Sequence, residues 1–252
     1  MEFHIKSETV HINLATADAL YETVTNRFRL GQGFALATLN LDHLVKLTGS
    51  QNFRNAYTKQ DLIVADGNPI VWLSRLAGKP VDLLPGSELI VPLAKLAAKE
   101  RIKIALVGST DATLKKASIA LNKQIPDLEI VATIAPPFGL DPKGPEADTI
   151  LAELNASDAR LCFLALGAPK QEFFAAFGRS TAPHIGFASI GAGLDFIAGR
   201  QTRAPKWVRK FALEWLWRML SNPLRLGPRY LRCILILPRL MVDALQLRST
   251  KN

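Results

Sequence analysis

The 252-residue sequence lacks the patterns by which many phosphate-binding and metal-binding proteins are recognised. It has no Walker phosphate loop. The only Gly-x-Gly that follows a strand-like apolar run, Gly191-Ala-Gly193, has Phe196 where a dinucleotide-binding loop needs a third small residue. The four histidines show no metal-ligand spacing, and there is no Asp-x-Asp pair to hold a divalent ion on a nucleotide diphosphate. We therefore expect no nicotinamide cofactor and no bound metal.

Cysteines and long apolar runs are also scarce. Cys162 lies in an apolar run and Cys233 lies near the C-terminus, and neither has a redox-type or metal-type neighbour, so we expect two buried, reduced thiols. The first residues alternate polar and apolar side chains instead of forming a secretion signal, which predicts a cytosolic protein. Arg232 and Pro238 interrupt the apolar C-terminal residues long before the roughly 20 that a membrane-spanning helix needs.

The positive charge is concentrated at one end of the chain. The formal net charge is +9, but residues 200–252 hold 12 Lys or Arg and 2 acids, whereas residues 1–199 hold 19 bases and 20 acids. A nearly neutral body with a basic end predicts that this end meets something anionic, such as phosphate, an acidic membrane surface or nucleic acid. We therefore divide the chain into a body, residues 1–199, and a basic, aromatic, helical appendage, residues 200–252.

The body alternates strand-like apolar runs with helical patterns. This alternation is typical of an α/β fold in which helices cover both faces of a mostly parallel, Rossmann-like sheet. The expected strands lie near residues 10–14, 34–40, 61–66, 103–110, 129–134, 160–166 and 185–190. The expected helices lie near residues 16–28, 42–57, 69–76, 87–99, 111–124 and 145–154.

One strand of this body ends at an acidic residue. Leu62 to Ala65 form an unbroken apolar run, Asp66 follows it, and Gly67 and Pro69 suit a sharp turn into a helix. Ligands of open parallel sheets lie beyond the carboxyl ends of the strands, so Asp66 is placed to face a substrate. The alternative is that Asp66 merely caps the helix that begins near Pro69.

Further polar residues follow the other strands, and the complete series resembles a known family. In chain order the motifs are Thr38-x-Asn40, Asp66-Gly67, Gly167-x-Pro169-Lys170-Gln171-Glu172, Gly191-x-Gly193-x-Asp195-Phe196, Arg203-Ala204-Pro205, Glu214-Trp215-Leu216-Trp217-Arg218 and Pro223-x-Arg225. From about residue 38 to 230 this series resembles the WecG/TagA/CpsF glycosyltransferases, glycosyltransferase family 26. The resemblance implies an inverting, metal-independent enzyme that moves a sugar from a UDP-sugar to a polyprenyl-pyrophosphate-linked saccharide. Such enzymes work peripherally at the cytoplasmic face of the membrane, in envelope or exopolysaccharide assembly.

The resemblance also implies roles at the strand ends. Asp66 matches the position of the base that takes the proton from the acceptor hydroxyl during transfer. Thr38 and Asn40 match positions that orient the sugar or the acceptor.

The two glycine-containing motifs are assigned to substrate binding on the same ground. Gln171, in the motif that begins at Gly167, resembles a sugar-contacting residue; the alternative is an amide that only stabilises a helix start. Lys170 and Glu172 fit a solvated pair of charges equally well. Asp195 either binds nucleotide or only orders the glycine-rich turn.

The appendage supplies positive charge that could bind a diphosphate. Arg203, Arg218 and Arg225 match basic positions of the family, and guanidinium groups bind phosphate oxygens well enough to replace a metal at a leaving diphosphate. The alternative for each arginine is an ordinary surface charge. The interleaved aromatic residues, Trp207, Phe211, Trp215 and Trp217, suit a helix lying among lipid headgroups, or else they pack on the body; we favour an anionic membrane surface.

The sequence departs from the family pattern after the Asp66 motif. Leu83 stands where relatives commonly have Arg, and Glu88 where they have Asp, so the donor sugar is left open. The rival hypothesis is a noncatalytic nucleotide- or nucleic-acid-binding α/β protein with a basic arm. It gives the strand-end residues no purpose, so we expect no nucleic-acid partner. The acceptor saccharide and any homo-oligomer are also left open.

Overall fold

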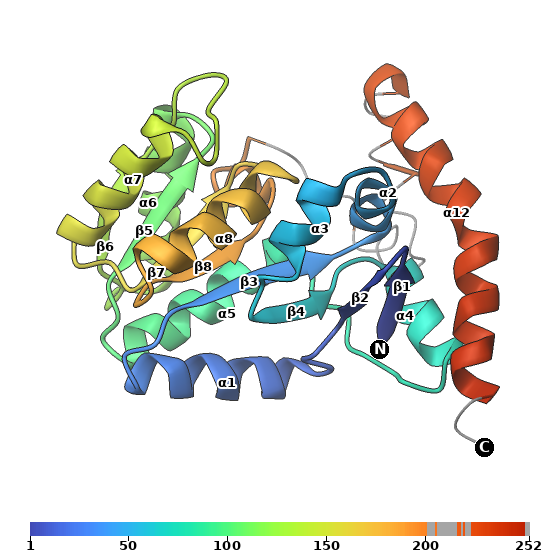
Figure 1. The fold of residues 1–252 in the computed structure, drawn as a ribbon. Coiled ribbons are helices and arrows are strands. Elements are labelled where there is room, and N and C mark those ends of the chain that lie inside the picture. Colours follow the sequence, from blue (N-terminus) through green and yellow to red (C-terminus); the bar gives the residue numbers. More distant parts are fainter. Residues whose placement is uncertain (201–204, 206–215, 218, 220–222, 250–252) are drawn as a thin grey trace.

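The structure, a computed structural model, describes residues 1–200, 205, 216–217, 219 and 223–249. Within them, six parallel strands form one sheet in the order β4-β3-β8-β7-β5-β6 (Figure 1). This arrangement confirms the predicted parallel α/β sheet. The strands are β3 (Phe34–Leu39), β4 (Leu62–Ala65), β5 (Ile104–Gly108), β6 (Ile130–Ile134), β7 (Leu161–Ala165) and β8 (Gly186–Ser189).

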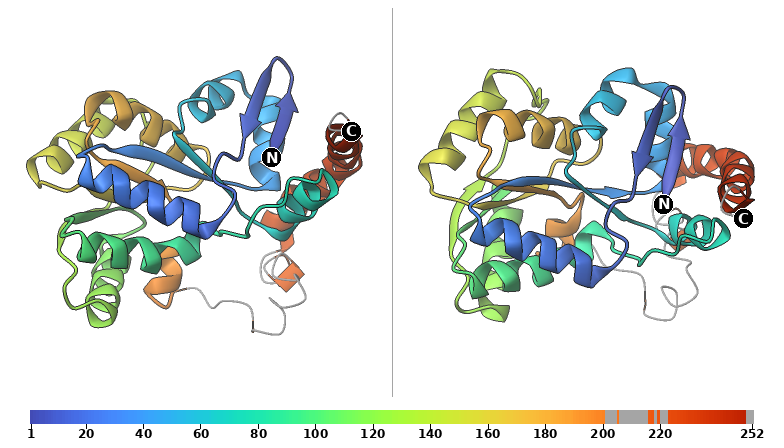
Figure 2. Two further views of the ribbon diagram at one scale, coloured as in Figure 1. Left: turned by 90° about the horizontal axis from the view of Figure 1, so that it is seen from below. Right: turned by 60° about the horizontal axis from the view of Figure 1, so that its bottom comes forward.

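Helices cover both faces of the sheet, as predicted. Along β3, Phe34 and Leu36 pack on one face while Ala35 and Ala37 pack on the other, because successive side chains of a strand point to opposite sides. Figure 2 is seen from the side of the first face, which is covered by α1 (Ala17–Arg29), α5 (Gly86–Lys99), α6 (Asp111–Gln124) and α9 (Gly193–Ile197). The second face is covered by α2 (Leu41–Gly49), α3 (Gln51–Tyr57), α7 (Pro145–Ala156) and α8 (Lys170–Thr181).

The N-terminal segment differs from the prediction. The expected strand near residues 10–14 is β2 (Glu8–His11), which pairs in antiparallel fashion with β1 (Glu2–Ile5) in a sheet of its own. The prediction missed β1 because only Phe3 and Ile5 of its four residues are buried, so its apolar run is too short to stand out.

The expected helix over residues 42–57 is also wrong in detail. The chain forms two helices, α2 and α3, because Ser50 takes an extended conformation between them and its Oγ accepts a hydrogen bond from the Phe53 amide at 3.2 Å. Ser50 is thus the N-cap of α3. The bend allows His43 of α2 and Tyr57 of α3 to meet.

The predicted helical appendage is confirmed for its C-terminal half. Helix α12 (Pro223–Ser249) packs on α2 and on α4 (Asn68–Leu76), at the edge of the sheet nearest β4 (Figure 1). Within the described residues, no helix has the combined length and hydropathy needed to cross a membrane. The division of the chain at residue 199 stays a prediction.

Both cysteines are buried free thiols, as expected. Burial raises the pKa of the Cys162 thiol well above its ordinary value and that of Cys233 to about 11. Neither thiol is therefore a reactive nucleophile at neutral pH.

Candidate active site

The site begins where β3 and β4 end side by side. The Asp66 amide donates to the Leu39 carbonyl at 2.8 Å, so the pairing of β3 and β4 continues one residue beyond β4. The Asn40 side chain then bridges the two strand ends. Its Nδ2 donates to Asp66 Oδ2 at 3.3 Å, while its Oδ1 accepts from the His43 amide at 3.0 Å and caps α2. The capping bond fixes the amide that contacts the Asp66 carboxylate.

Asp66 itself is half-buried at this edge. The N-cap position of α4 belongs to Gly67, whose φ of 94° is accessible chiefly to glycine, and not to Asp66. Asp66 therefore does not occupy the position that the helix-capping alternative assigns to it. Its carboxylate combines partial exposure with an amide partner, an arrangement suited to proton transfer.

Thr38 is the second-last residue of β3. It is opposite Val64 in the register of β3 and β4, and only 4% of its surface is exposed. Its assignment to the catalytic site stays a prediction.

The loop after β7 brings the second predicted motif to the same edge. A side chain on Gly167 would meet nothing within 4 Å, so this residue borders open space. Gln171 lies in the first turn of α8, beyond this loop, and not directly at the end of β7. Its Oε1 accepts from the Gly191 amide at 3.0 Å, which ties the loop after β7 to the loop after β8. A sugar contact by Gln171 stays a prediction.

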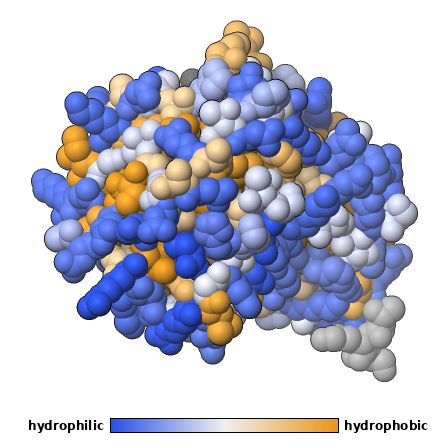
Figure 3. All heavy atoms as spheres, turned by 60° about the vertical axis from the view of Figure 1, so that its left-hand side comes forward, coloured by the Kyte–Doolittle hydropathy of each residue, from blue (hydrophilic) through white to orange (hydrophobic). Residues whose placement is uncertain are grey.

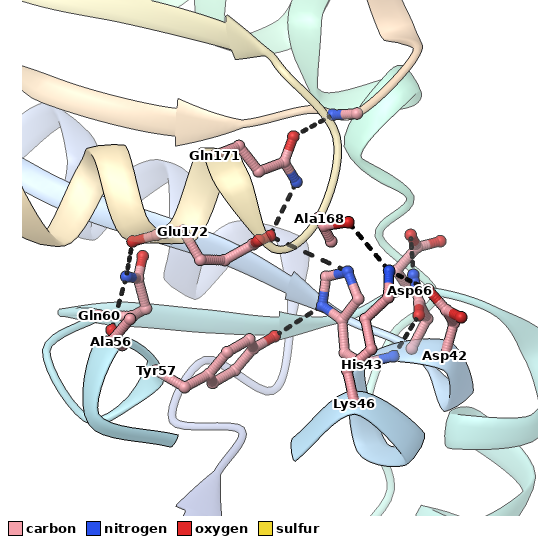
Figure 4. Close-up of polar contacts among 12 residues, drawn as sticks. Asp42, His43, Lys46, Ala56, Tyr57, Gln60, Asp66, Ala168, Gln171 and Glu172 are labelled. Carbon is pink, nitrogen blue, oxygen red and sulfur yellow. Dashed lines mark hydrogen bonds and ion pairs between the residues drawn. The ribbon is translucent and has the colours of Figure 1, made fainter. Parts of the chain in front are cut away.

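A buried polar network lies behind these loops (Figure 4). Gln171 Nε2 donates to Glu172 Oε1 at 2.8 Å, and the Glu172 carbonyl accepts from Gln60 Nε2 at 3.1 Å. His43 Nε2 lies 3.9 Å from the same carboxylate oxygen, and His43 Nδ1 lies 3.1 Å from the Tyr57 hydroxyl. The network links α2, α3 and α8 across the ends of the strands.

Glu172 decides against one alternative that the sequence left open. That alternative was a solvated pair of charges with Lys170, yet Glu172 is fully buried, whereas Lys170 is exposed. Burial raises the pKa of Glu172 to about 7, and burial, helped by the nearby Lys46, lowers the pKa of His43 to about 3. His43 is therefore neutral at pH 7, and its contact with Glu172 is not an ion pair there.

A second polar group lies at the end of β5. Ser109 Oγ donates to Asp195 Oδ1 at 3.1 Å, and Thr110 caps α6 by accepting from the Thr113 amide. Arg200 donates to the hydroxyls of Thr110 and Thr113 at 3.3 and 3.0 Å. The Asp195 side chain thus bonds to the turn after β5, whereas one alternative had it ordering the glycine-rich turn at residues 191–193. Its contact with a nucleotide stays a prediction.

The predicted arginines of the appendage are not assessed by the structure. Arg203 and Arg218 lie outside the described residues, and Arg225 belongs to α12 by its backbone while its side chain is not among the described parts. In the described ranges, no three His, Cys, Asp or Glu side chains come together as a metal site would require.

Two comparisons show which known proteins this chain is similar to. The sequence model described as the glycosyl transferase WecG/TagA/CpsF family matches residues 6–250. The chain belongs to this family. A relative from Bacillus spizizenii is 26% identical over 210 residues, which cover 81% of this chain and 79% of the relative. That relative is an N-acetylglucosaminyldiphosphoundecaprenol N-acetyl-beta-D-mannosaminyltransferase.

Membership of this family decides between the glycosyltransferase hypothesis and its noncatalytic rival. This WecG/TagA/CpsF protein is a glycosyltransferase of the hexosyltransferase type, not a noncatalytic binding protein with a basic arm. The predicted family is confirmed. His43 and Tyr57 are the neighbours of the site that the sequence did not reveal, because their contacts depend on the bend between α2 and α3.

Proposed function

We propose that this protein is an inverting, metal-independent transferase that moves a sugar from a UDP-sugar to a polyprenyl-diphosphate-linked saccharide. The observation that carries the proposal is the half-buried carboxylate of Asp66, held by Asn40 at the joint end of β3 and β4. The name of the Bacillus relative, which transfers an N-acetyl-β-D-mannosaminyl group to a lipid-diphosphate-linked N-acetylglucosamine, supports the same substrate classes here.

Asp66 is the proposed general base. It takes the proton of the acceptor hydroxyl while that oxygen attacks the anomeric carbon from the face opposite the departing UDP. Attack from that face inverts the configuration, so an α-linked donor gives a β-linked product. The Asn40 amide, which donates to Asp66 Oδ2 at 3.3 Å, orients the carboxylate so that its other oxygen meets the acceptor. Thr38 and Gln171 are proposed to position the sugar.

The donor is proposed to lie across the sheet edge, from Asp66 toward the end of β5. In the strand order β4-β3-β8-β7-β5, the ends of β4 and β5 are four strand spacings apart, or about 19 Å. Ser109, Thr110 and Asp195 would meet the nucleotide, in keeping with the N-terminus of α6, where helix amides favour anions. Gly167, where an added Cβ would meet no atom within 4 Å, follows β7 between these two ends.

The leaving UDP develops negative charge on its phosphates. We propose that Arg203, Arg218 and Arg225 neutralise this charge in place of a divalent ion, because a guanidinium group offers two parallel donors to phosphate oxygens and stays protonated. This part of the proposal depends on the family resemblance and on the excess of positive charge in residues 200–252.

The lipid-linked acceptor is proposed to reach the site from a membrane surface held by α12. The inner side of α12, which includes Leu240 and Ala244, packs on the core. The outer side carries an apolar stripe at helical spacing that is about half exposed or more: Leu224, Leu231, Leu235, Val242 and Leu245. By contrast, the face in Figure 3, on the left-hand side of Figure 1, is mostly hydrophilic, with hydrophobic residues in small separate groups. The stripe and its interleaved bases suit the cytoplasmic headgroup region.

The proposal is tested by assaying the purified protein with UDP-N-acetylmannosamine and a short-chain, diphosphate-linked N-acetylglucosamine, in the presence of EDTA. We expect a disaccharide product whose new linkage is β, as read from the anomeric signals in NMR spectra. A product with retained configuration, or transfer that stops on chelation and returns with added metal, would refute the stated mechanism. If this donor fails, other UDP-sugars are tried, since Leu83 departs from the family pattern.

A further inference from the structure

A basic cavity of about 290 Å³ lies between α2 and α12, beside the candidate active site. Six residues, three from each helix, line it. They are Asp42, Val45, Lys46, Pro228, Arg229 and Arg232.

The cavity carries an excess of two positive charges. Asp42 is the one acidic residue of the lining, and it pairs with Lys46 Nζ at 2.6 Å and with Arg229 Nε at 3.0 Å. Arg232 is exposed and makes no ion pair within the described part of the chain, so its guanidinium group is available to a ligand. Three cations around one carboxylate leave a net charge of +2, which matches the two negative charges of a doubly esterified diphosphate.

The cavity also lies at a suitable distance from the proposed base. Lys46 Nζ donates to the Ala168 carbonyl at 2.9 Å, in the loop that begins at Gly167. Lys46 follows Asn40 by six residues of α2, or about 9 Å along the helix axis. Figure 4 shows Asp42 and Lys46 next to Asp66 and Ala168. The cavity therefore lies beside the proposed base.

We propose that this cavity binds the diphosphate group of the lipid-linked acceptor; the inference rests on the proposed function. Lys46, Arg229 and Arg232 hold the phosphate oxygens, which places the acceptor sugar with its hydroxyl toward Asp66. Leu231 and Leu235, exposed on α12 beside Arg232, lie where the lipid chain leaves the diphosphate. The cavity thus joins the polar site to the apolar stripe.

The test compares two water-soluble acceptors in the absence of membranes, namely an N-acetylglucosamine with a short alkyl diphosphate and its phosphate-free alkyl glycoside. With the full-length protein, we expect the KM to be at least about tenfold lower for the diphosphate, equivalent to about 1.4 kcal/mol. Arg232→Gln should raise the KM for the diphosphate acceptor about tenfold, while the KM for the phosphate-free acceptor and for the donor stay within twofold.

Arg239→Gln is the matched control, because Arg239 lies two helical turns further along α12, is exposed, and faces Asp243 instead of the cavity. It should leave all three KM values unchanged. The inference would be overturned if Arg232→Gln and Arg239→Gln changed the KM for the diphosphate acceptor equally. It would also be overturned if Arg232→Gln raised the KM equally for both acceptors. An effect of Arg232→Gln that occurs only when phosphatidylglycerol vesicles are present would overturn it too, since the cavity would then bind lipid headgroups. Failure of the unsubstituted protein to use either acceptor would instead reject the proposed function.

Discussion

The buried carboxyl group of Glu172 gives a prediction about stability that can be followed with pH. Burial raises the pKa of Glu172 from 4.5 to about 7 in the folded protein, and Oε2 has no hydrogen-bond partner among the described residues. The folded state therefore keeps a proton that the unfolded chain releases between about pH 4.5 and 7. The free energy of unfolding must fall as the pH rises through this range, by about 3 kcal/mol in total.

His43 acts in the opposite direction. Its pKa is lowered from 6.5 to about 3 in the folded state, chiefly by burial. The unfolded chain therefore binds a proton at His43 that the folded protein does not, and stability is lost as the pH falls from about 6.5 toward 3. Between about pH 4.5 and 6.5 the contributions of Glu172 and His43 offset each other, so their combined effect on the stability of the unsubstituted protein is small there.

Glu172→Gln removes the contribution of Glu172 to this pH dependence and leaves that of His43. The amide introduced by this substitution cannot ionise, but its oxygen can still accept the bond from Gln171. Relative to the unsubstituted protein, the variant should gain about 3 kcal/mol of unfolding free energy between pH 4.5 and 8, or about 6–12 °C in Tm for a chain of this size. Urea denaturation at a series of pH values measures the difference.

The control for this prediction is Glu153→Gln, because Glu153 is exposed on α7. It removes a carboxylate that takes no part in the buried network, so it should not reproduce the gain in stability of Glu172→Gln. If the stability difference caused by Glu172→Gln is constant from pH 4.5 to 8, the reasoning from burial is wrong.

Two further predictions concern the strand ends and the appendage. Asn40→Ala should destabilise the protein by about 1 kcal/mol through loss of the α2 cap and should also lower kcat, whereas Asn40→Ser, which keeps a capping oxygen, should lower kcat with little loss in urea stability. Equal stability of both variants would contradict the capping role. Deletion of residues 200–252 should abolish both vesicle association, measured by co-sedimentation, and sugar transfer; a truncated protein that stays fully active would disprove the role of the appendage.

Much of the fold could be predicted because its strands are buried on both faces. All six residues of β3 are buried, and the same is true of the four residues of β4, so each strand stands out as an apolar run. The convergence of Asn40 and Asp66 follows from the parallel pairing of these strands, which places both ends at one edge. Polar residues directly after apolar runs therefore identified side chains that the fold brings together.

The contacts behind the site could not be predicted in this way. Glu172 meets His43 across 129 positions of the chain, and no local pattern distinguishes a buried glutamate from an exposed one. His43 and its partner Tyr57 belong to two helices that meet at the extended residue Ser50. The cavity between α2 and α12 likewise combines residues nearly 200 positions apart, so only the packing of the helices reveals it.

The most direct test of the central proposal is to measure donor binding and sugar transfer together for Asp66→Asn. Isothermal calorimetry with UDP-sugar should give a Kd within a few-fold of that of the unsubstituted protein, because the substitution keeps the shape of the side chain. The kcat for transfer should fall by about 10²–10⁴-fold, because an amide cannot accept the acceptor proton. Ordinary turnover by this variant, with donor binding intact, would contradict the assignment of Asp66 as the base.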